Sequence, residues 1–227
     1  MIPKRMAPSK MRLYLNQRQK FGAMRPSTPD ASTGSMGATR CIVLAAGASQ
    51  RLGQPKALLP FGEMTLIQYL VERLESFGLQ PVIVTRAELS VDIMLALPER
   101  IIVINPNPEA GRTGSLQTGL KQILDSKGGQ RAFRLLIAPV DRPGFSDATL
   151  KTLLDSETCR CPSKDGKGGH PLLLMAEDVA RVLTADPSTP LRDLCSPTRF
   201  EVEDAHLHLN LDEPNDLEAL QGLVESM

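Results

Sequence analysis

The chain has 227 residues, 26 basic and 26 acidic side chains, and a hydrophobic fraction of 41%, values typical of a globular protein of one domain. No apolar run reaches the roughly 20 residues needed to cross a bilayer. Four scattered cysteines without a regular framework indicate a reducing, cytoplasmic environment. Residues 1–40 hold eight bases against one acid, whereas residues 41–227 hold 18 bases against 25 acids. The body is therefore acidic, which disfavours a nucleic-acid partner.

Residues 1–39 differ from the rest of the chain. They lack sustained apolar periodicity and end in a stretch rich in Ser, Thr and Pro that could not bury a core. We predict a disordered tail, or a true start at Met24 or Met36. A targeting leader is the alternative, because the segment is basic and poor in acids. The folded domain is then expected to span residues 40–227.

From residue 40 onward, short apolar runs alternate with segments of helical periodicity. Strands are expected at residues 41–46, 81–85, 101–104 and 133–140, and helices over 66–77, 116–124 and from 150 onward. After residue 155 the pattern is weaker and predicts strands at 172–174 and 205–211 and helices near 176–184 and 213–225. The alternation predicts right-handed βαβ units in a three-layer α/β/α sandwich with a mainly parallel, Rossmann-like sheet.

Open sheets of this kind bind ligands at the carboxyl ends of their strands, and the first such end carries a glycine loop. It reads Leu44-Ala45-Ala46-Gly47-Ala48-Ser49-Gln50-Arg51-Leu52-Gly53-Gln54-Pro55-Lys56. The two glycines lack the spacing of a dinucleotide fingerprint, and Gly53 lacks the Lys-Ser/Thr ending of a P-loop. The loop either offers backbone amides and two bases, Arg51 and Lys56, to a triphosphate, or it is a tight turn with two solvated bases.

The pattern L-A-x-G-x-S-x-R-x-G-x-x-K resembles the signature of nucleotidyltransferases that make nucleotide-activated sugars and molybdopterin dinucleotides. The resemblance covers roughly residues 40–222. It implies the nucleotidyltransferase fold, transfer of a nucleotidyl group to a phosphorylated acceptor, release of pyrophosphate, and Mg²⁺ as cofactor. The implied nucleotide-binding residues of the loop are Leu44, Ala45, Ala46, Gly47, Ser49, Arg51 and Lys56, of which Arg51 and Lys56 are also catalytic.

A second loop runs from Asn105 to Leu116. By itself it is a Pro/Gly loop that ends at a helix start, with Thr113 or Ser115 as the cap. It is similar to the N-P-x-x-x-G-x-x-x-S-L stretch of the molybdenum cofactor cytidylyltransferase branch, although Thr113-Gly114 replaces the usual pair of serines. That resemblance implies nucleotide binding by Asn105 and Ser115.

Two acidic positions are expected to hold the metal. Asp141 ends a buried apolar strand, which is costly unless the side chain stabilises a turn or binds a cation. The segment from Asn210 to Leu217 resembles the N-x-D-T-P-E-D-L motif, with Glu213 and Asn215 in place of Thr and Glu. The resemblance implies that Asp141 binds Mg²⁺ and that Asp212, or alternatively Asn210, is the second ligand. Without it, Asp212 is a helix cap.

The sequence Gly168-Gly169-His170-Pro171 resembles the G-x-x-G-H-P of the same branch, which implies an acceptor site at Gly169 and His170. The alternative is a histidine packed in a turn. Cys159 and Cys161 with His170 lack the spacing of a zinc site. His206 and His208 alternate on one face of the strand expected at 205–211, where structural roles are predicted.

The Ala46-Gly47 form of the glycine loop is associated in the family with CTP, and a Gly-Gly form with GTP. The resemblance therefore implies transfer of CMP to molybdopterin that carries molybdenum, with a molybdenum hydroxylase as a possible recipient of the product. Two alternatives stay open. The acceptor could be a sugar phosphate or another small phosphorylated alcohol, or the protein could be a non-catalytic accessory that inserts the cofactor into a hydroxylase. No membrane partner is expected.

Overall fold

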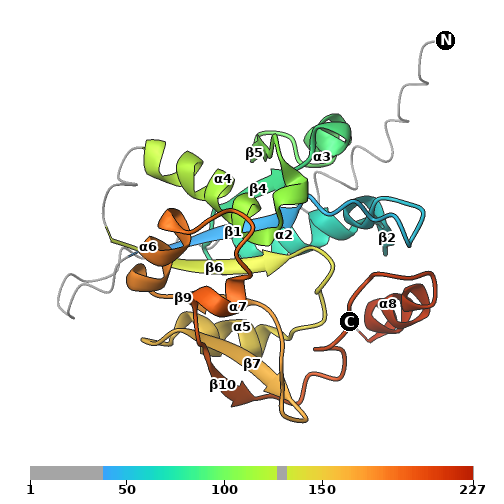
Figure 1. Cartoon of the computed structure of the whole chain (residues 1–227). Coiled ribbons are helices and arrows are strands. Elements are labelled where there is room, and N and C mark those ends of the chain that lie inside the picture. Colours follow the sequence, from blue (N-terminus) through green and yellow to red (C-terminus); the bar gives the residue numbers. More distant parts are fainter. Residues whose placement is uncertain (1–37, 127–131, 227) are drawn as a thin grey trace. The chain divides into compact units, whose positions relative to one another are not determined.

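The computed structural model describes residues 38–126 and 132–226 (Figure 1). The tail predicted for residues 1–39 lies almost entirely outside the described residues, so its nature and the boundary at residue 40 stay predictions. Within the described part of the chain, no helix combines the length and the apolar character that crossing a bilayer requires.

The centre of the molecule is an eight-stranded sheet in the order β10-β7-β9-β6-β1-β4-β5, with β8 paired to β7. Its strands are β1 (Thr39–Ala45), β4 (Pro81–Thr85), β5 (Ile101–Ile104), β6 (Arg134–Pro139), β7 (Arg160–Lys164), β8 (Lys167–Gly168), β9 (Leu172–Leu174) and β10 (Thr198–Glu201). Strands β6, β1, β4 and β5 are mutually parallel, and β9 runs antiparallel to β6 and β7. A separate hairpin pairs β2 (Pro60–Phe61) with β3 (Met64–Thr65). The mainly parallel sheet is thus confirmed.

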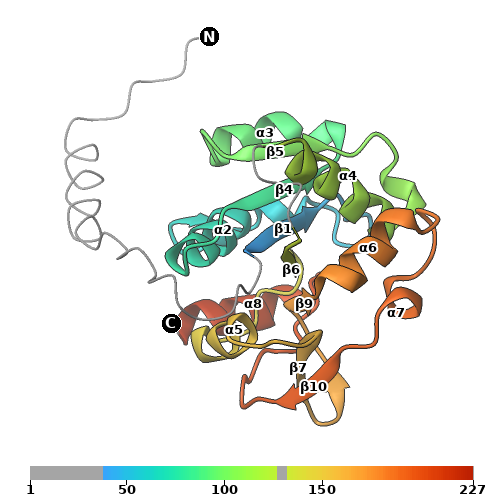
Figure 2. The ribbon, with the colours of Figure 1, turned by 90° about the vertical axis from the view of Figure 1, so that its left-hand side faces the viewer.

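Helices cover both faces of the sheet (Figure 2). They are α2 (Leu66–Ser76), α3 (Ser90–Ala96), α4 (Arg112–Asp125), α5 (Asp147–Leu154), α6 (Ala176–Thr184), α7 (Leu191–Leu194) and α8 (Asp216–Glu225), with short 3₁₀ turns η1 (Lys56–Leu58), η2 (Ala87–Leu89) and η3 (Pro108–Ala110). Side chains of β1 alternate between two cores: Val43 packs with α2, α5 and α8, and Ile42 packs with α4 and α6. Because successive side chains of a strand point to opposite faces of the sheet, each face packs against its own layer of helices, which gives the α/β/α sandwich.

Helix α4 packs unusually close to the sheet. A Cβ at Gly119 would lie 2.8 Å from both Ile42 Cδ1 and Val84 Cγ2, so only glycine fits there without a shift of the sheet. The helix therefore lies directly over β1 and β4, and its first turn stands at the ends of these strands. Ser115, in that turn, reaches the edge of the sheet where ligands bind in this class of fold.

The strand predicted for Ala205–Leu211 is wrong, because this segment folds as consecutive turns. Its backbone bonds are local, with Leu207 N–H donating to the Asp204 carbonyl. The segment crosses the loop after β6 so closely that a Cβ at Gly144 would lie 1.9 Å from the carbonyl oxygen of His206. The Asp204 carboxylate fixes the crossing by accepting hydrogen bonds from Ser146 N–H and Thr149 Oγ1. The prediction that His206 and His208 share a strand face fails with the strand.

Candidate functional site

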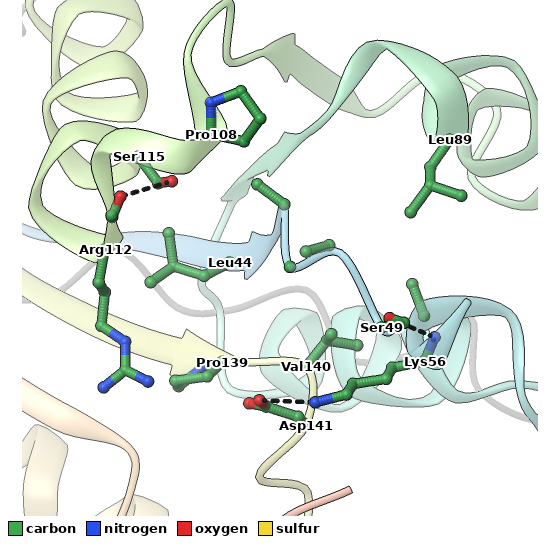
Figure 3. A pocket seen from close by; sticks show the side chains of 15 residues that line it. Leu44, Ser49, Lys56, Leu89, Pro108, Arg112, Ser115, Pro139, Val140 and Asp141 are labelled. Atoms are coloured by element: carbon green, nitrogen blue, oxygen red, sulfur yellow. Dashed lines mark hydrogen bonds and ion pairs between the residues drawn. The ribbon is translucent and has the colours of Figure 1, made fainter. Parts of the chain in front are cut away.

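A cavity of about 260 Å³ opens at the carboxyl ends of β1 and β6, between the glycine loop and the start of α4 (Figure 3). It is lined by Leu44, Ala45, Ala46, Gly47, Ser49, Lys56, Ala57, Leu89, Pro108, Gly111, Arg112, Ser115, Pro139, Val140 and Asp141. Eight of these residues were predicted from the sequence as site residues. The cavity lies where ligands bind in open α/β sheets.

The glycine loop is folded back on itself by its own polar groups. Ser49 has a positive φ of 52°, and Gly53 has a φ of 74°. The Ser49 hydroxyl oxygen accepts a hydrogen bond from Lys56 N–H at 3.2 Å, and the Ser49 carbonyl accepts one from Gly53 N–H at 3.2 Å. A non-glycine residue in the left-handed region is a local strain that often marks a binding loop. The fold of the loop returns Lys56 to the end of β1.

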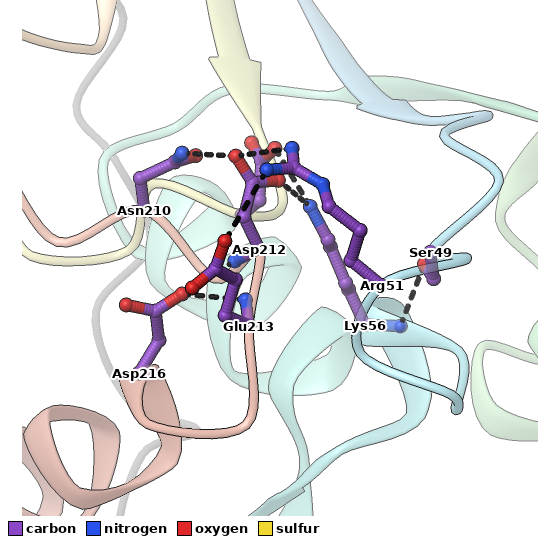
Figure 4. A network of polar contacts seen from close by, with 8 residues as sticks. Ser49, Arg51, Lys56, Asn210, Asp212, Glu213 and Asp216 are labelled. Atoms are coloured by element: carbon purple, nitrogen blue, oxygen red, sulfur yellow. Dashed lines mark hydrogen bonds and ion pairs between the residues drawn. The ribbon is translucent and has the colours of Figure 1, made fainter.

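The Lys56 ammonium group lies between the two acids that were predicted as metal ligands, Asp141 (Figure 3) and Asp212 (Figure 4). Its Nζ is 2.5 Å from Asp212 Oδ1 and 3.5 Å from Asp141 Oδ2. The two acids are joined through the backbone, since Leu211 N–H donates to the Asp141 carbonyl at 3.1 Å. The Lys56 hydrogen bond is the main reason that the pKa of Asp212 is lowered. Both carboxylates therefore face one cation position.

Three neighbouring residues hold Asp212 in place. Arg51 Nη2 lies 3.1 Å from Asp212 Oδ2, and its Nη1 lies 3.5 Å from Glu213 Oε1. Asn210 Nδ2 also donates to Asp212 Oδ2. The Asp216 carboxylate accepts from the backbone N–H groups of both Asp212 and Glu213, at 2.8 and 2.7 Å. Because α8 begins only at Asp216, Asp212 is not its N-cap, and the carboxylate is available to cations.

The arrangement fits a hard divalent cation. Mg²⁺ takes one or two carboxylates from a protein and fills its other positions with water and phosphate oxygens. Among the described residues, no group of three or more His, Cys, Asp or Glu side chains could hold a metal. A cation between Asp141 and Asp212 would thus depend on ligands from substrate and water, and Lys56 would have to leave the position that it occupies here.

Ser115 lines the cavity, whereas Asn105 supports it from behind. Asn105 is 4% exposed, and its Nδ2 donates to Ser115 Oγ at 3.0 Å. The Asn105 Oδ1 accepts from the backbone N–H of Asn107 at 2.9 Å. Neither Thr113 nor Ser115 caps α4, whose N-cap is Gly111 without a side chain. Asn105 therefore orients the loop and the serine rather than reaching the cavity.

Gly169 and His170 lie outside the cavity lining. A Cβ at Gly169 would be 2.7 Å from Leu207 Cγ, so packing alone explains this glycine. His170 Nδ1 is buried without a hydrogen-bond partner. Burial, followed by the charges of Arg112 and Arg142, lowers the pKa of His170 to about 3. The two arginines were not predicted as site residues, although Arg112 stands inside the loop from Asn105 to Leu116 and Arg142 directly follows Asp141.

The structure thus gathers most of the predicted residues in two adjoining places. The cavity takes Leu44 to Gly47, Ser49, Lys56, Ser115 and Asp141, and the polar network beside it takes Arg51 and Asp212. The predicted roles of these residues are not tested by their positions. Sequence reasoning missed Arg112, which lines the cavity from the first turn of α4, because an arginine in a loop is ordinarily solvated.

Comparison with known proteins identifies related chains. The profile of the family described as the MobA-like NTP transferase domain matches residues 41–202. The molybdenum cofactor guanylyltransferase of Xanthomonas euvesicatoria pv. vesicatoria is 32% identical over 120 residues, which cover 53% of this chain and 56% of the relative. Nicotine blue oxidoreductase of Paenarthrobacter nicotinovorans is 32% identical over 118 residues, 51% of this chain and 55% of the relative. The chain spans about half the length of these curated relatives.

Solved structures share the fold along most of the chain. Rv0371c from Mycobacterium tuberculosis H37Rv superposes with a TM-score of 0.69 at 21% identity, over 82% of this chain and 98% of that one. Its complex with manganese gives 0.65 at 19% identity, over 84% and 100%. Molybdopterin-guanine dinucleotide biosynthesis protein A from Archaeoglobus fulgidus gives 0.62 at 16% identity, over 83% and 100%. At these identities the likeness shows the fold alone, and the expected nucleotidyltransferase fold is confirmed.

Proposed function

The chain belongs to the family of MobA-like NTP transferase domains, and from this premise we propose that it transfers CMP from CTP to the phosphate group of molybdopterin. An oxygen of the acceptor phosphate attacks the α-phosphorus of CTP. The bond from the α-phosphorus to the bridging oxygen of the β-phosphate breaks, and pyrophosphate leaves with the electron pair. The observation that carries the proposal is Lys56 held between Asp141 and Asp212 at the mouth of the cavity.

The donor triphosphate is proposed to lie along the glycine loop. Small side chains at Ala45, Ala46 and Gly47 let backbone N–H groups approach the phosphates, and Ser49 holds the loop through its bond to Lys56 N–H. Lys56 and Arg51 then neutralise charge on the departing pyrophosphate. Arg51 is well placed for such a change of partner because its side chain is 66% exposed.

Asp141 and Asp212 are the residues that would hold Mg²⁺. When bound, the ion would neutralise charge on the phosphate oxygens as the pyrophosphate departs. The manganese complex of a structural neighbour supports a divalent cation, and the hydrogen bond from Asn210 to Asp212 favours Asp212 over Asn210 as the second ligand. In the proposed reaction Lys56 leaves the two carboxylates and binds the triphosphate. The same side chain thus neutralises the carboxylates before the metal binds and the triphosphate afterwards.

The proposed choice of CTP depends on the size of the cavity. At about 260 Å³ it is slightly smaller than the roughly 300–1,000 Å³ of most small-molecule sites. The methyl group of Ala46 lines it, at 8% exposure. A pyrimidine fits such a space more readily than a purine. GTP is the competing donor, because one curated relative is a guanylyltransferase.

Molybdopterin is proposed as the acceptor on the family relationship alone, and a molybdenum hydroxylase as the recipient of the product. A sugar phosphate or another small phosphorylated alcohol would suit the same chemistry. A non-catalytic accessory role would leave the pairing of Lys56 with two carboxylates without a purpose, and it predicts no turnover with any nucleotide.

The decisive experiment measures pyrophosphate release with CTP and with GTP, with and without molybdenum cofactor, at saturating Mg²⁺. Release that needs CTP, metal and molybdenum cofactor together is the expected result. An Asp193→Ala variant serves as the matched control, because Asp193 is an exposed acid on α7 away from the cavity. Absence of release with every nucleotide would leave the accessory role, and release with a sugar phosphate alone would change the acceptor.

A further inference from the structure

The first turn of α4 begins without the side-chain cap that usually stabilises a helix start. Its N-cap is Gly111, which has no side-chain oxygen to accept hydrogen bonds from the N–H groups of the turn. The same turn lines the cavity with Gly111, Arg112 and Ser115. Helix ends without caps fray readily, and fraying here would displace the residues that face the cavity. The shape of the cavity therefore depends on what else holds this turn.

Residues 185–190, which join α6 to α7, supply the missing hydrogen bonds. The carbonyl oxygen of Pro187 accepts a hydrogen bond from Gly114 N–H at 3.1 Å. The Thr113 hydroxyl, on a side chain that is almost fully buried, donates to the carbonyl oxygen of Thr189 at 2.6 Å. Two backbone carbonyls that are remote in the sequence thus hold the turn in place of an N-cap side chain.

The segment 185–190 is itself held in shape by local hydrogen bonds. Asp186 Oδ1 accepts from the backbone N–H and from the hydroxyl of Ser188, at 2.8 and 2.6 Å. The Asp186 carbonyl oxygen accepts from Thr189 N–H at 2.9 Å. The two bonds from Ser188 lower the pKa of Asp186, so its carboxylate is ionised near pH 7 and keeps accepting them. The two carbonyls that face α4 therefore belong to an ordered turn.

A further pair of bonds links the segment to the second turn of α4. Gln117 Nε2 donates to the carbonyl oxygens of Val182 and Ala185, at 2.9 and 2.8 Å. Helices α4 and α6 lie side by side, and residue 185 is where the segment leaves α6 (Figure 2). The first two turns of α4 are thus bound at successive points to the end of α6 and the segment that follows it.

The pair Thr113-Gly114 suits this contact better than the two serines that are usual at these positions. A Cβ at Gly114 would lie 3.2 Å from the Cβ of Pro187, which is tighter than ordinary van der Waals contact. A serine there would press against Pro187 and lengthen the bond from its own N–H to the Pro187 carbonyl. The departure from the motif is therefore matched by the segment that packs on it.

From these contacts we infer that Thr113 is a positioning residue for the donor nucleoside triphosphate, acting through residues 185–190. The inference rests on the proposed function and adds what sets the affinity of its donor site. The groups proposed for the chemical step, Lys56, Asp141 and Asp212, lie on other elements and are held by their own ion pairs. Loss of the Thr113 bond therefore weakens nucleotide binding, which raises KM, and leaves kcat nearly unchanged.

The test uses the full chain and compares Thr113→Val with Thr113→Ser. Valine has nearly the shape of threonine but cannot donate to the Thr189 carbonyl, whereas serine keeps the hydroxyl. Thr118→Val is the matched control, because Thr118 is on the same helix and its hydroxyl donates to the Gly114 carbonyl within that helix. Gln117→Met removes the bonds to the end of α6 without changing a residue of the cavity lining.

Two measurements are made on each variant. Steady-state pyrophosphate release with molybdenum cofactor gives kcat and KM for CTP and for GTP, and hydrogen exchange with mass spectrometry follows residues 111–116. We expect Thr113→Val to raise the nucleotide KM about ten-fold, to change kcat less than about three-fold, and to accelerate exchange in 111–116. Thr113→Ser should restore most of the affinity. Gln117→Met should raise KM by a smaller factor, and Thr118→Val should change neither measurement.

Two results would overturn the inference. An unchanged KM in Thr113→Val, even with a lower Tm, would mean that the bond serves stability alone. A fall in kcat at constant KM would assign the turn to the chemical step instead of to nucleotide binding. A wild type that releases no pyrophosphate with either nucleotide counts against the proposed function. Hydrogen exchange then still tests the segment, because unchanged exchange in Thr113→Val would show that residues 185–190 do not hold the turn.

Discussion

The basic residues around the end of β6 fall into two groups. Lys56 and Arg51 are ion-paired with Asp141, Asp212 and Glu213. Arg112, in the first turn of α4, and Arg142, on the loop after β6, have no acidic partner within the described residues. A ligand of the first group must exchange one set of ion pairs for another. A ligand of the second group meets unpaired positive charge, which increases the attraction for an anion.

This difference suits the two substrates. In the proposed reaction, Asp141 and Asp212 would hold the metal ion that accompanies the donor, and Lys56 would then bind the triphosphate. The acceptor phosphate brings no metal of its own in the proposed reaction, so its bases must come from the protein. In the proposed reaction the ion-paired bases therefore change partners, whereas the unpaired arginines need no such change.

The largest expected effect follows from removing Asp141, which is paired with Lys56 and directly precedes Arg142. Asp141→Ala should lower turnover by about 1,000-fold or more, because a metal-held stabilisation of several kcal/mol is lost. The fold should persist, since Asp141 is only half-buried. Rates of pyrophosphate release and thermal unfolding are measured together, with Asp193→Ala as control. A folded variant with near-normal activity would remove Asp141 from the mechanism.

A second prediction addresses the ion pairs of Lys56 with Asp141 and Asp212, which a bound metal ion would replace. Lys56→Met should reduce turnover about 100-fold. It should also strengthen binding of Mn²⁺ alone, roughly ten-fold, because the competing ammonium group 2.5 Å from Asp212 is gone. Mn²⁺ affinity without nucleotide is measured by electron paramagnetic resonance, with Lys151→Met on the exposed face of α5 as control. An unchanged Mn²⁺ affinity would mean that Lys56 does not occupy the metal position.

The β1 side of the sheet could be predicted from the sequence better than the β9 side. Buried parallel strands read as continuous apolar runs, and β1, β4, β5 and β6 all have such runs. Strand β7 reads Arg-Cys-Pro-Ser-Lys and β10 reads Thr-Arg-Phe-Glu, which lack both an apolar run and clear alternation. These strands were therefore missed. Tertiary pairing outweighs local preference there.

The site shows the same division. The glycine loop and Asp141 could be placed because each directly follows a strand, and strand ends converge at one edge. No spacing in the sequence predicts that Asp212 meets Asp141, since this depends on the crossing of residues 204–211 over Gly144. Arg112 and Arg142 each resemble any solvated arginine. Only the effect of their charges on the pKa of His170 distinguishes them.

The choice of base gives a third and smaller effect on the donor side. One extra methyl group in a filled site costs a larger ligand about 1–3 kcal/mol, or about 10- to 200-fold in selectivity. We expect a preference for CTP over GTP in the wild type and partial relaxation toward GTP in Ala46→Gly. The ratio of kcat/KM for the two nucleotides is measured with one acceptor and saturating Mg²⁺. Equal use of both, or a GTP preference, would contradict the cytidylyl assignment and leave the transferase assignment intact.

The smallest effect concerns the β9 side without ligand. The pKa of His170 is lowered from 6.5 to about 3, first by burial and then by Arg112 and Arg142. As the pH falls below about 6.5, the unfolded chain takes up a proton at this position while the folded chain does not, until about pH 3. The free energy of unfolding therefore decreases with falling pH in that window, by up to about 1.4 kcal/mol per pH unit from this residue. In His170→Asn this contribution disappears, so stability should decline less steeply between pH 6.5 and 4. Urea denaturation at several pH values measures the slope, with Arg192→Gln as control. Equal slopes in the wild type and His170→Asn would show that the folded protein does not keep the imidazole neutral.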